Sequence, residues 1–241
     1  LLSDAPRGIL PCYASAKVAP TPEGTAARIA AERAAGFTAH KIGWPPFGGP
    51  LEGDLAFLEA ARSAAPGALL MVDAAQAFDE ASALGRVAAF ERFELAWLEE
   101  PLDRADLAGQ ARLRAASPVP IAAGEGECSL AGLRRVAPLV DVLQPDVTRC
   151  GVLAAMAAAP LVARVCSHSF TTLLNVVAHA HALAAMPNGW MLEWPVKGLA
   201  DWAVLFPGAP LAHDGQFTVP DAPGWGLRPD PAALDRYRMP R

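Results

Sequence analysis

Seven ionisable side chains stand where the predicted strands of this 241-residue chain end. Five of them are acids, and three of these, Asp73, Glu99 and Glu125, follow one another at intervals of 26 residues. A single acid at a strand end is most often a helix N-cap or a solvated loop residue. Three carboxylates that converge on one point repel one another unless a cation neutralises them, and oxygen ligands of this kind suit Mg²⁺. The spacing therefore favours a magnesium site held by these three acids.

The sixth and seventh predicted strands end on Asp146 and His168. A carboxylate beside an imidazole fixes the tautomer of the ring and raises its basicity, which produces a general base or acid. The alternative is a buried histidine satisfied by any acceptor. That second interpretation is favoured for His179 and His181, which lie at helical spacing in the segment VVAHAHALAAM. The eighth predicted strand adds one more acid, Glu193.

The second predicted strand, TAHKIG, ends on Lys41. This lysine either extends its ammonium group to the surface or stands at the mouth of a site and moves a proton. Because side chains alternate along a strand, Ala39 and Lys41 point the same way, and His40 is expected to turn outward.

The elements that would position these residues alternate along the chain. Eight apolar runs indicate strands at residues 9–15, 38–43, 69–74, 95–100, 120–125, 141–147, 163–169 and 190–195. Helical patterns fill the seven intervals, at about 22–35, 52–65, 79–92, 105–116, 129–137, 151–161 and 172–186. Eight units that repeat about every 25 residues predict a closed α/β barrel of the TIM type, whose active site lies at the carboxyl ends of the strands. A doubly wound open sheet is the alternative, but no GxGxxG or GxxxxGK follows any strand.

The composition of the sequence changes after the eighth predicted strand. Residues 1–195 are predicted to form the barrel. Residues 196–241 are rich in proline and glycine, with one strand indicated at QFTV, and are expected to form an irregular tail that packs on the barrel and on a capping domain.

Composition limits the class of partner. The formal net charge is −5 and the charges are scattered, which argues against a nucleic acid or an anionic membrane as partner. No apolar run reaches the roughly 18 residues that a membrane span requires, and no signal peptide is recognisable. The four cysteines have no zinc-ligand spacing and predict a reduced, cytoplasmic protein.

Several motifs, taken in their order along the chain, resemble those of the enolase superfamily. They are MVDAAQAF, WLEEPL, PIAAGE, LQPDVTRCG, CSHSF, MLEWP and VPDAPGWGL. Within that superfamily they resemble the mandelate racemase branch, which includes many acid-sugar dehydratases. The resemblance implies a (β/α)7β barrel with an N-terminal capping domain over its mouth, and a homo-oligomeric assembly. Because the chain begins where the capping domain should end, we expect that domain to be missing and apolar side chains to be exposed near the strand ends and the tail.

The resemblance also implies roles for the residues at the strand ends. Asp73, Glu99 and Glu125 would hold Mg²⁺, and Asp146 with His168 would form a catalytic dyad. Two further roles complete the set: Glu193 would hydrogen-bond a substrate carboxylate oxygen and be partly protonated or shared, and Lys41 would be a base on the substrate face opposite His168.

Two positions depart from the family pattern. Ala39 replaces the first lysine of the usual Lys-x-Lys, and Ala75 stands where a polar substrate contact is common. A neighbouring ammonium group would have lowered the pKa of Lys41 and made it a better base.

The function implied is Mg²⁺-dependent abstraction of the proton α to a carboxylate in a small substrate. Dehydration of an acid sugar to a 2-keto-3-deoxy acid is the leading hypothesis. A racemase or epimerase of a 2-hydroxy acid is the first alternative, and an inactive truncated barrel is the second.

Overall fold

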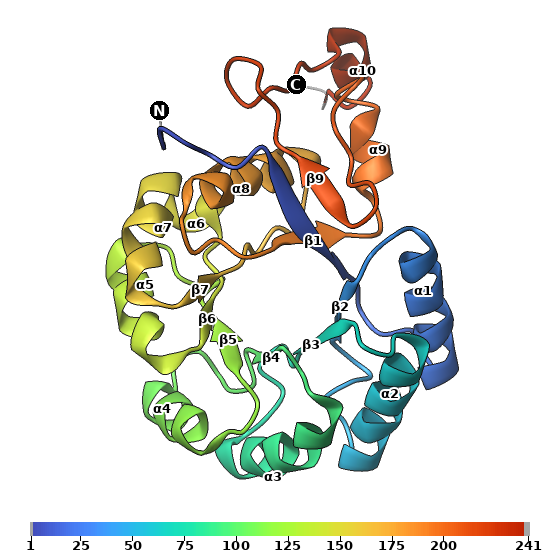
Figure 1. Cartoon of the computed structure of the whole chain (residues 1–241), viewed down its shortest axis with the longest axis vertical. Coiled ribbons are helices and arrows are strands. Elements are labelled where there is room, and N and C mark those ends of the chain that lie inside the picture. The colour runs from blue at the N-terminus through green and yellow to red at the C-terminus, as the bar shows by residue number, and fades with distance from the viewer. Residues whose placement is uncertain (1, 239–241) are drawn as a thin grey trace.

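The computed structural model describes residues 2–238 and shows a parallel sheet curled around a central axis, with helices on its outside (Figure 1). The strands are β1 (Ile9–Ser15), β2 (Ala39–Gly43), β3 (Leu69–Asp73), β4 (Trp97–Glu99), β5 (Ile121–Ala123), β6 (Val142–Leu143), β7 (Arg164–Val165) and β8 (Leu192–Pro195). Their order in the sheet is β7-β6-β5-β4-β3-β2-β1-β8, and all these neighbours pair in parallel. The predicted α/β class and all eight predicted strands are confirmed.

Backbone hydrogen bonds also join the two ends of this sheet. The amide of Val165 in β7 donates to Asn188 O at 3.1 Å, and the amide of Trp190 donates to Val165 O at 2.7 Å. The segment that contains Asn188 and Trp190 leads directly into β8. The ring of strands in Figure 1 is therefore completed as in a barrel and not left as an open, doubly wound sheet.

Helices cover the outside of the ring. They are α1 (Pro22–Ala34), α2 (Leu51–Ala64), α3 (Glu80–Phe90), α4 (Leu107–Ala116), α5 (Leu130–Val136), α6 (Val147–Cys150), α7 (Val152–Ala158) and α8 (Leu173–Ala185). Side chains cap two of these helices: Thr21 accepts a hydrogen bond from Gly24 N at the start of α1, and Ser129 accepts one from Gly132 N at the start of α5. The ends of α3, α5 and α7 tighten into short 3-10 helices at Glu91–Phe93, Ala137–Leu139 and Ala159–Leu161. Of these eight helices, α6 alone lies outside the predicted helical ranges.

The inside of the barrel is closed by one layer of apolar side chains, which we call the apolar layer. Each strand, or the residue next to it, contributes one member: Tyr13, Ala39, Met71, Trp97, Ala122, Val142, Cys166 and Met191. Large and small side chains lie side by side, and the rings of Tyr13 and Trp97 meet edge to face with centroids 5.4 Å apart. The barrel is therefore filled at this level and carries no pore.

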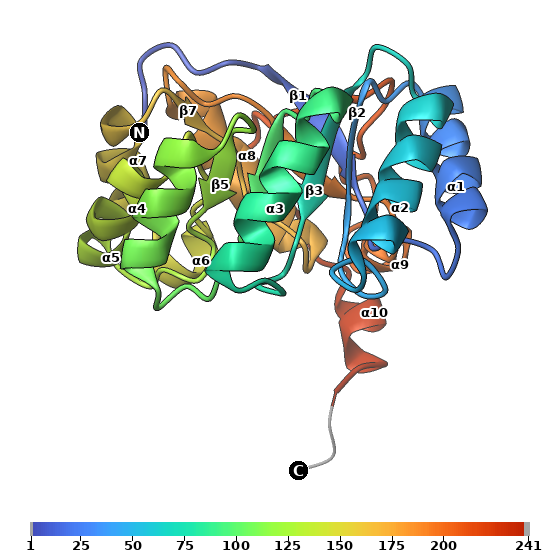
Figure 2. The ribbon, with the colours of Figure 1, turned by 90° about the horizontal axis from the view of Figure 1, so that it is seen from below.

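The C-terminal segment returns to the first strand. Strand β9 (Gln216–Thr218) pairs antiparallel with the beginning of β1, and Phe217 is buried against Trp194. Two short helices that the sequence did not predict, α9 (Leu199–Ala203) and α10 (Pro231–Asp235), lie on either side of β9 in the chain, and α10 extends away from the barrel (Figure 2).

Large apolar side chains are exposed in the two places where the sequence predicted them. Around the tail they are Trp202, Val204, Leu211, Trp225, Leu234 and Tyr237. At the strand ends Trp44 follows β2 and Phe170 follows β7, with 42% and 37% of their surfaces exposed. None of the helices within residues 2–238 has the length and apolar character needed to cross a membrane.

Candidate active site

A second layer of side chains lies two residues beyond the apolar layer on the same strands. Because side chains alternate along a strand, these residues point to the same axis one step closer to the carboxyl ends. This polar layer consists of Ser15, Lys41, Asp73, Glu99, Gln144, His168 and Glu193. On β5 the corresponding position is Gly124, whose φ of 129° turns the chain so that the next residue, Glu125, reaches the layer.

Lys41 lies at the centre of this polar layer. Its Nζ is 2.6 Å from Glu99 Oε1, 2.8 Å from Glu193 Oε1 and 4.0 Å from Asp73 Oδ2. Only 4% of the side chain is exposed. Burial lowers the pKa of Lys41, but the charges of Glu193 and Glu99 outweigh burial and hold that pKa well above its usual value. The lysine is an ammonium ion in this arrangement, and it does not reach the surface.

The same alternation accounts for the neighbours of Lys41. His40 turns outward, as predicted, and its Nδ1 lies 2.8 Å from Glu32 of helix α1. Ala39 belongs to the apolar layer and is buried beside bulky rings. A lysine at position 39 would place its stem among apolar side chains in this arrangement.

Three donors fix the carboxylate of Glu99. Lys41 Nζ donates to Oε1, whereas Trp97 Nε1 and Gln144 Nε2 both donate to Oε2, at 3.0 and 2.8 Å. Glu99 is 1% exposed. A buried carboxylate needs such donors because an unpaired charge away from water is strongly unfavourable. The orientation of Glu99 is thus determined by Trp97 of its own strand, by Lys41 of β2 and by Gln144 at the end of β6.

Glu193 is held with equal tightness on the neighbouring strands. Ser15 Oγ donates to Oε1 at 2.8 Å, and the backbone amide of Ser169 donates to Oε2 at 2.7 Å. Burial opposes ionisation of Glu193, but the charges of Lys41 and His168 outweigh it and lower its pKa to about 2. A buried ammonium ion thus lies against this carboxylate. The hydrogen bond of Glu193 to a substrate carboxylate oxygen, with a proton held in part or shared, stays a prediction.

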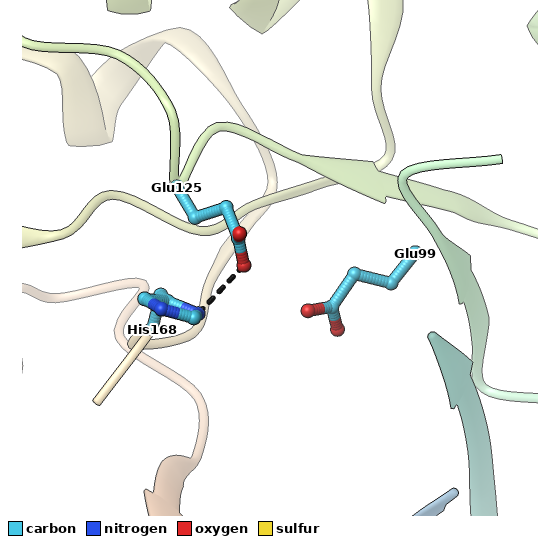
Figure 3. A group of neighbouring side chains, drawn as sticks. All are labelled: Glu99, Glu125 and His168. Carbon is cyan, nitrogen blue, oxygen red and sulfur yellow. Dashed lines mark ion pairs between the residues drawn. The ribbon is translucent and has the colours of Figure 1, made fainter. Parts of the chain in front are cut away.

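His168 pairs with Glu125 on one side of the site (Figure 3). His168 Nδ1 lies 2.7 Å from Glu125 Oε2 and 3.6 Å from Glu193 Oε2. The contact with Glu125 is an ion pair whose angle is poor for a hydrogen bond. Burial lowers the pKa of the imidazole, but the two carboxylates outweigh it and raise the pKa to about 9. Ligand atoms of Glu99, Glu125 and His168 lie within 4.8 Å of one another. Among residues 2–238, this trio is the group close enough to hold one metal ion.

Asp73, the third predicted metal ligand, lies beside that group and outside it. Its Oδ2 accepts a hydrogen bond from Trp44 Nε1 at 2.8 Å, and its Oδ1 accepts one from the amide of Ala75 at 2.9 Å. Burial and the charge of Glu99 raise the pKa of Asp73 to about 7. The three predicted metal ligands thus lie on neighbouring strands, at β3, β4 and the end of β5, but Asp73 is turned toward Trp44.

The predicted dyad of Asp146 and His168 is not paired in the structure. Asp146 caps helix α6, where it accepts hydrogen bonds from the amide and the hydroxyl of Thr148 at 2.8 and 2.6 Å. The imidazole nearest to it is His179, whose Nε2 lies 3.5 Å from Asp146 Oδ1. His168 is held by Glu125 and Glu193 instead, so its pairing with Asp146 remains a prediction for another state.

His179 has the structural role expected for it. Its Nε2 accepts a hydrogen bond from Val147 N at 2.9 Å, and its Nδ1 lies 2.8 Å from Asn175 O in the same helix. Burial lowers the pKa of His179, so the ring is neutral.

Sequence reasoning missed several residues of this site. None of Trp97, Ser15, Trp44, Gln144 and Ser169 was predicted to belong to it. The signal that could have found Ser15 and Gln144 is positional, since each lies two residues beyond an apolar member of its strand. Trp44 and Ser169 act through a loop indole and a backbone amide, for which the strand pattern gives no signal.

A pocket opens above Lys41 at the carboxyl ends of β1, β2, β7 and β8. Its lining includes Lys17, Lys41, Trp44, His168 and Glu193. Two proton-carrying side chains, Lys41 and His168, therefore face one space beside a group of carboxylates. Such an arrangement can bind a carboxylate substrate and move protons to and from it.

Comparison with known proteins agrees with this geometry. Residues 25–233 match the family described as "Enolase C-terminal domain-like". The chain is 34% identical over 235 residues to D-galactarolactone cycloisomerase of Agrobacterium fabrum, covering 89% of this chain and 60% of that protein. It is also 35% identical over 133 residues to L-talarate/galactarate dehydratase of Salmonella typhimurium, covering 52% of this chain and 33% of that protein.

Solved structures share the fold over nearly the whole chain. A racemase from Streptomyces coelicolor A3(2) with bound magnesium superposes with a TM-score of 0.85 at 25% identity, covering 97% of this chain and 64% of that one. This chain thus spans less than two thirds of the length of these relatives. The match across residues 25–233 shows that the chain belongs to the enolase C-terminal domain-like family, as its motifs indicated.

Proposed function

We propose that the site abstracts the proton α to a carboxylate with the help of Mg²⁺, and that the reaction is dehydration of an acid sugar to a 2-keto-3-deoxy acid. The observation that carries this proposal is that Lys41 and His168 line the same pocket beside Glu99 and Glu125. The relatives named above include an acid-sugar dehydratase and a sugar-acid cycloisomerase, which supports the substrate class.

The charges of the site fit a divalent cation. Four carboxylates, those of Asp73, Glu99, Glu125 and Glu193, surround two cations, the ammonium of Lys41 and the imidazolium of His168. If all four carboxylates are ionised, including that of Asp73, whose pKa of about 7 a bound cation would lower, they leave with the two positive charges a formal charge of −2. One Mg²⁺ would neutralise that charge. The ligands would be Asp73, Glu99 and Glu125, and the ion would supply positive charge to the carboxylate on which a second negative charge develops.

The chain's own groups would divide the proton transfers between them. The α-proton would pass to Nζ of Lys41. Because Lys41 is held as an ammonium ion between Glu99 and Glu193, it must first release its own proton to water in the pocket. His168, with its pKa raised to about 9, is protonated at neutral pH and suited to protonate the leaving β-hydroxyl. Loss of that hydroxyl as water gives an enol that becomes the 2-keto acid.

One alternative reaction is favoured by the same observation. If the proton returns to the α-carbon from the other side, two proton carriers in one pocket make a racemase or epimerase of a 2-hydroxy acid. The residues required are the same, and the substrate decides which of the two groups can reach a leaving hydroxyl.

The test uses deuterated water. The chain is incubated with a panel of acid sugars and 2-hydroxy acids in D₂O, with Mg²⁺ or with EDTA. A 2-keto product that requires Mg²⁺ supports dehydration, whereas α-deuteration without a keto product supports racemisation. If no acid in the panel gives a keto product or α-deuteration, both proposals are contradicted and an inactive barrel is favoured.

A matched pair of histidine variants assigns the proton carrier. His168→Asn should lower the rate of keto-acid formation by about 10²–10⁴-fold, which is the contribution expected of a general acid or base. His181→Asn is the control, because His181 is outside the pocket and contacts Trp225 O at 3.3 Å. Equal rates in the two variants would remove His168 from the mechanism.

A further inference from the structure

The loop that follows strand β1 is fastened to the end of β2. The amide of Ala16 donates to Lys41 O at 3.2 Å, and the amide of Val18 donates to Gly43 O at 2.9 Å. These bonds continue the pairing of β1 and β2 beyond Ser15, where the regular strand ends. The backbone around Lys17 is therefore held in place at the mouth of the barrel.

Alternation along this segment places Lys17 over the site. Tyr13 lies in the apolar layer and Ser15 contacts Glu193, so both point to the barrel axis. Val18 points the other way and packs in the apolar core between strands and helices. Lys17 shares the direction of Ser15, lines the pocket and lies about 6.6 Å further along the strand.

An ordered indole supports the lysine side chain. Nζ of Lys17 lies 4.2 Å from the ring centroid of Trp44, within the range of a cation–π contact. The indole of Trp44 is itself fixed, because its Nε1 donates to Asp73 Oδ2 at 2.8 Å. Trp44 also has a φ of 65°, a left-handed conformation that is rare for a large residue and is concentrated at functional sites.

Lys17 differs in its pairing from the other cations of the pocket. The other two cations of the pocket are paired, Lys41 with Glu99 and Glu193, and His168 with Glu125. Across residues 2–238, no salt bridge within 4.0 Å involves Lys17. A pocket that already has paired charges at its base thus presents one unpaired ammonium group at its mouth.

We propose that Lys17 binds a second anionic group at the end of the substrate remote from the reacting carboxylate, so that the substrate is a dicarboxylic sugar acid. The inference rests on the proposed function, because it assumes that one carboxylate of the substrate lies at the base of the pocket beside Lys41. A monocarboxylic sugar acid presents a hydroxymethyl group at the same position and makes no ion pair with Lys17.

Binding to two acids that differ only at that end tests the inference. Galactarate carries a carboxylate at C6 and galactonate carries a hydroxymethyl group, and the affinity for each is measured by calorimetry in Mg²⁺. The unaltered chain should bind galactarate about tenfold more tightly, as one charge-assisted hydrogen bond predicts. Lys17→Met should remove that preference while it changes galactonate binding less than about twofold, and Lys17→Arg should retain it.

The chain offers a matched control. Lys197 is exposed and follows strand β8, but it does not line the pocket. Lys197→Met removes the same charge from the neighbouring strand end and should leave the preference unchanged. Equal affinity for the two acids, a preference that survives in Lys17→Met, or binding of neither acid would overturn the inference.

The proposed function can fail separately. If Lys17-dependent binding of galactarate is found but no α-deuteration or keto acid appears in D₂O, the proposed reaction is wrong and the assignment of Lys17 stands. If turnover is found without a Lys17-dependent preference, the reaction stands and the assignment of Lys17 is wrong.

Discussion

The apolar layer and the polar layer are built from the same strands, two residues apart, yet they behave in opposite ways. Ala39 precedes Lys41, Met71 precedes Asp73, and Trp97 precedes Glu99, and each earlier residue packs where the later one carries charge. Burial of the apolar layer away from water stabilises the folded chain. The polar layer is placed above that dry base, where charges are weakly screened and must satisfy one another. The charged site therefore depends on the apolar layer beneath it.

The largest expected effect comes from moving a charge down into the apolar layer. Ala39→Lys introduces the first lysine of the Lys-x-Lys pattern that the resemblance implies, but here its stem must lie among Tyr13, Met71 and Trp97. Overpacking costs about 1–3 kcal/mol, and burial of an unpaired ammonium adds several more. We expect the free energy of unfolding, measured in urea, to fall by more than in the control Ala39→Leu, which is overpacked but uncharged.

A stable Ala39→Lys variant would contradict this account of the layer. If that variant unfolds at the same urea concentration as Ala39→Leu, the added ammonium has found partners in the polar layer. The two layers would then be less distinct than the packing indicates.

The next effect comes from removing the central charge of the polar layer. Lys41→Met leaves Glu99 and Glu193 buried without their common cation, and loss of one partner from a buried ion pair costs about 3–5 kcal/mol. The measurement is urea unfolding in EDTA at pH 7. Lys41→Met combined with Glu193→Gln should recover part of the loss, because one unpaired carboxylate is removed. No change in stability in the single variant would mean that the carboxylates accept protons at little cost.

The strands, helices and barrel class could be predicted from the sequence, because they depend on local periodicity. Alternation also predicted that His40 turns outward and that Lys41 faces inward. The partners of His168 could not be predicted, because Asp146 follows β6, the strand next to β7, and Glu125 follows β5, one strand further away. The geometry of the loops, and not the order of the strands, decides which acid pairs with the histidine. The turn at Gly124 carries Glu125 to His168, whereas helix α6 begins at Asp146 and holds its carboxylate as a cap.

The tail shows the same limit. A strand at QFTV could be predicted from its composition, and β9 forms there. The helices α9 and α10 have five residues each, too few for a helical period to appear in the sequence.

A smaller effect links the two layers through one side chain. Trp97 fills the apolar layer and donates its indole N–H to Glu99 Oε2. Trp97→Phe keeps most of the packing but removes one of the two side-chain hydrogen bonds to that oxygen, the other being from Gln144. Loss of a hydrogen bond to a charged group costs about 1.5–3 kcal/mol. Trp190→Phe is the control, because Trp190 packs against Trp97 but donates no side-chain hydrogen bond within residues 2–238. Similar urea midpoints for the two variants would show that the hydrogen bond adds nothing to the packing.

The smallest effect needs no substitution and is a difference between two cysteine thiols in their reactivity toward iodoacetamide. Burial raises the pKa of Cys166, in the apolar layer, to about 12, whereas Cys128 is exposed in the loop after β5. Alkylation requires the thiolate, so iodoacetamide at pH 8 should label Cys128 within minutes and leave Cys166 unlabelled until the chain unfolds. Because the pKa of Cys166 in the folded chain lies above the usual 9.0, its neutral thiol stabilises the fold below pH 9. That contribution is lost as the pH rises toward 12. Mass spectrometry of the peptides measures the rate at which each cysteine is labelled. Labelling of Cys166 at the rate of Cys128 would show that the apolar layer opens to water in the folded chain.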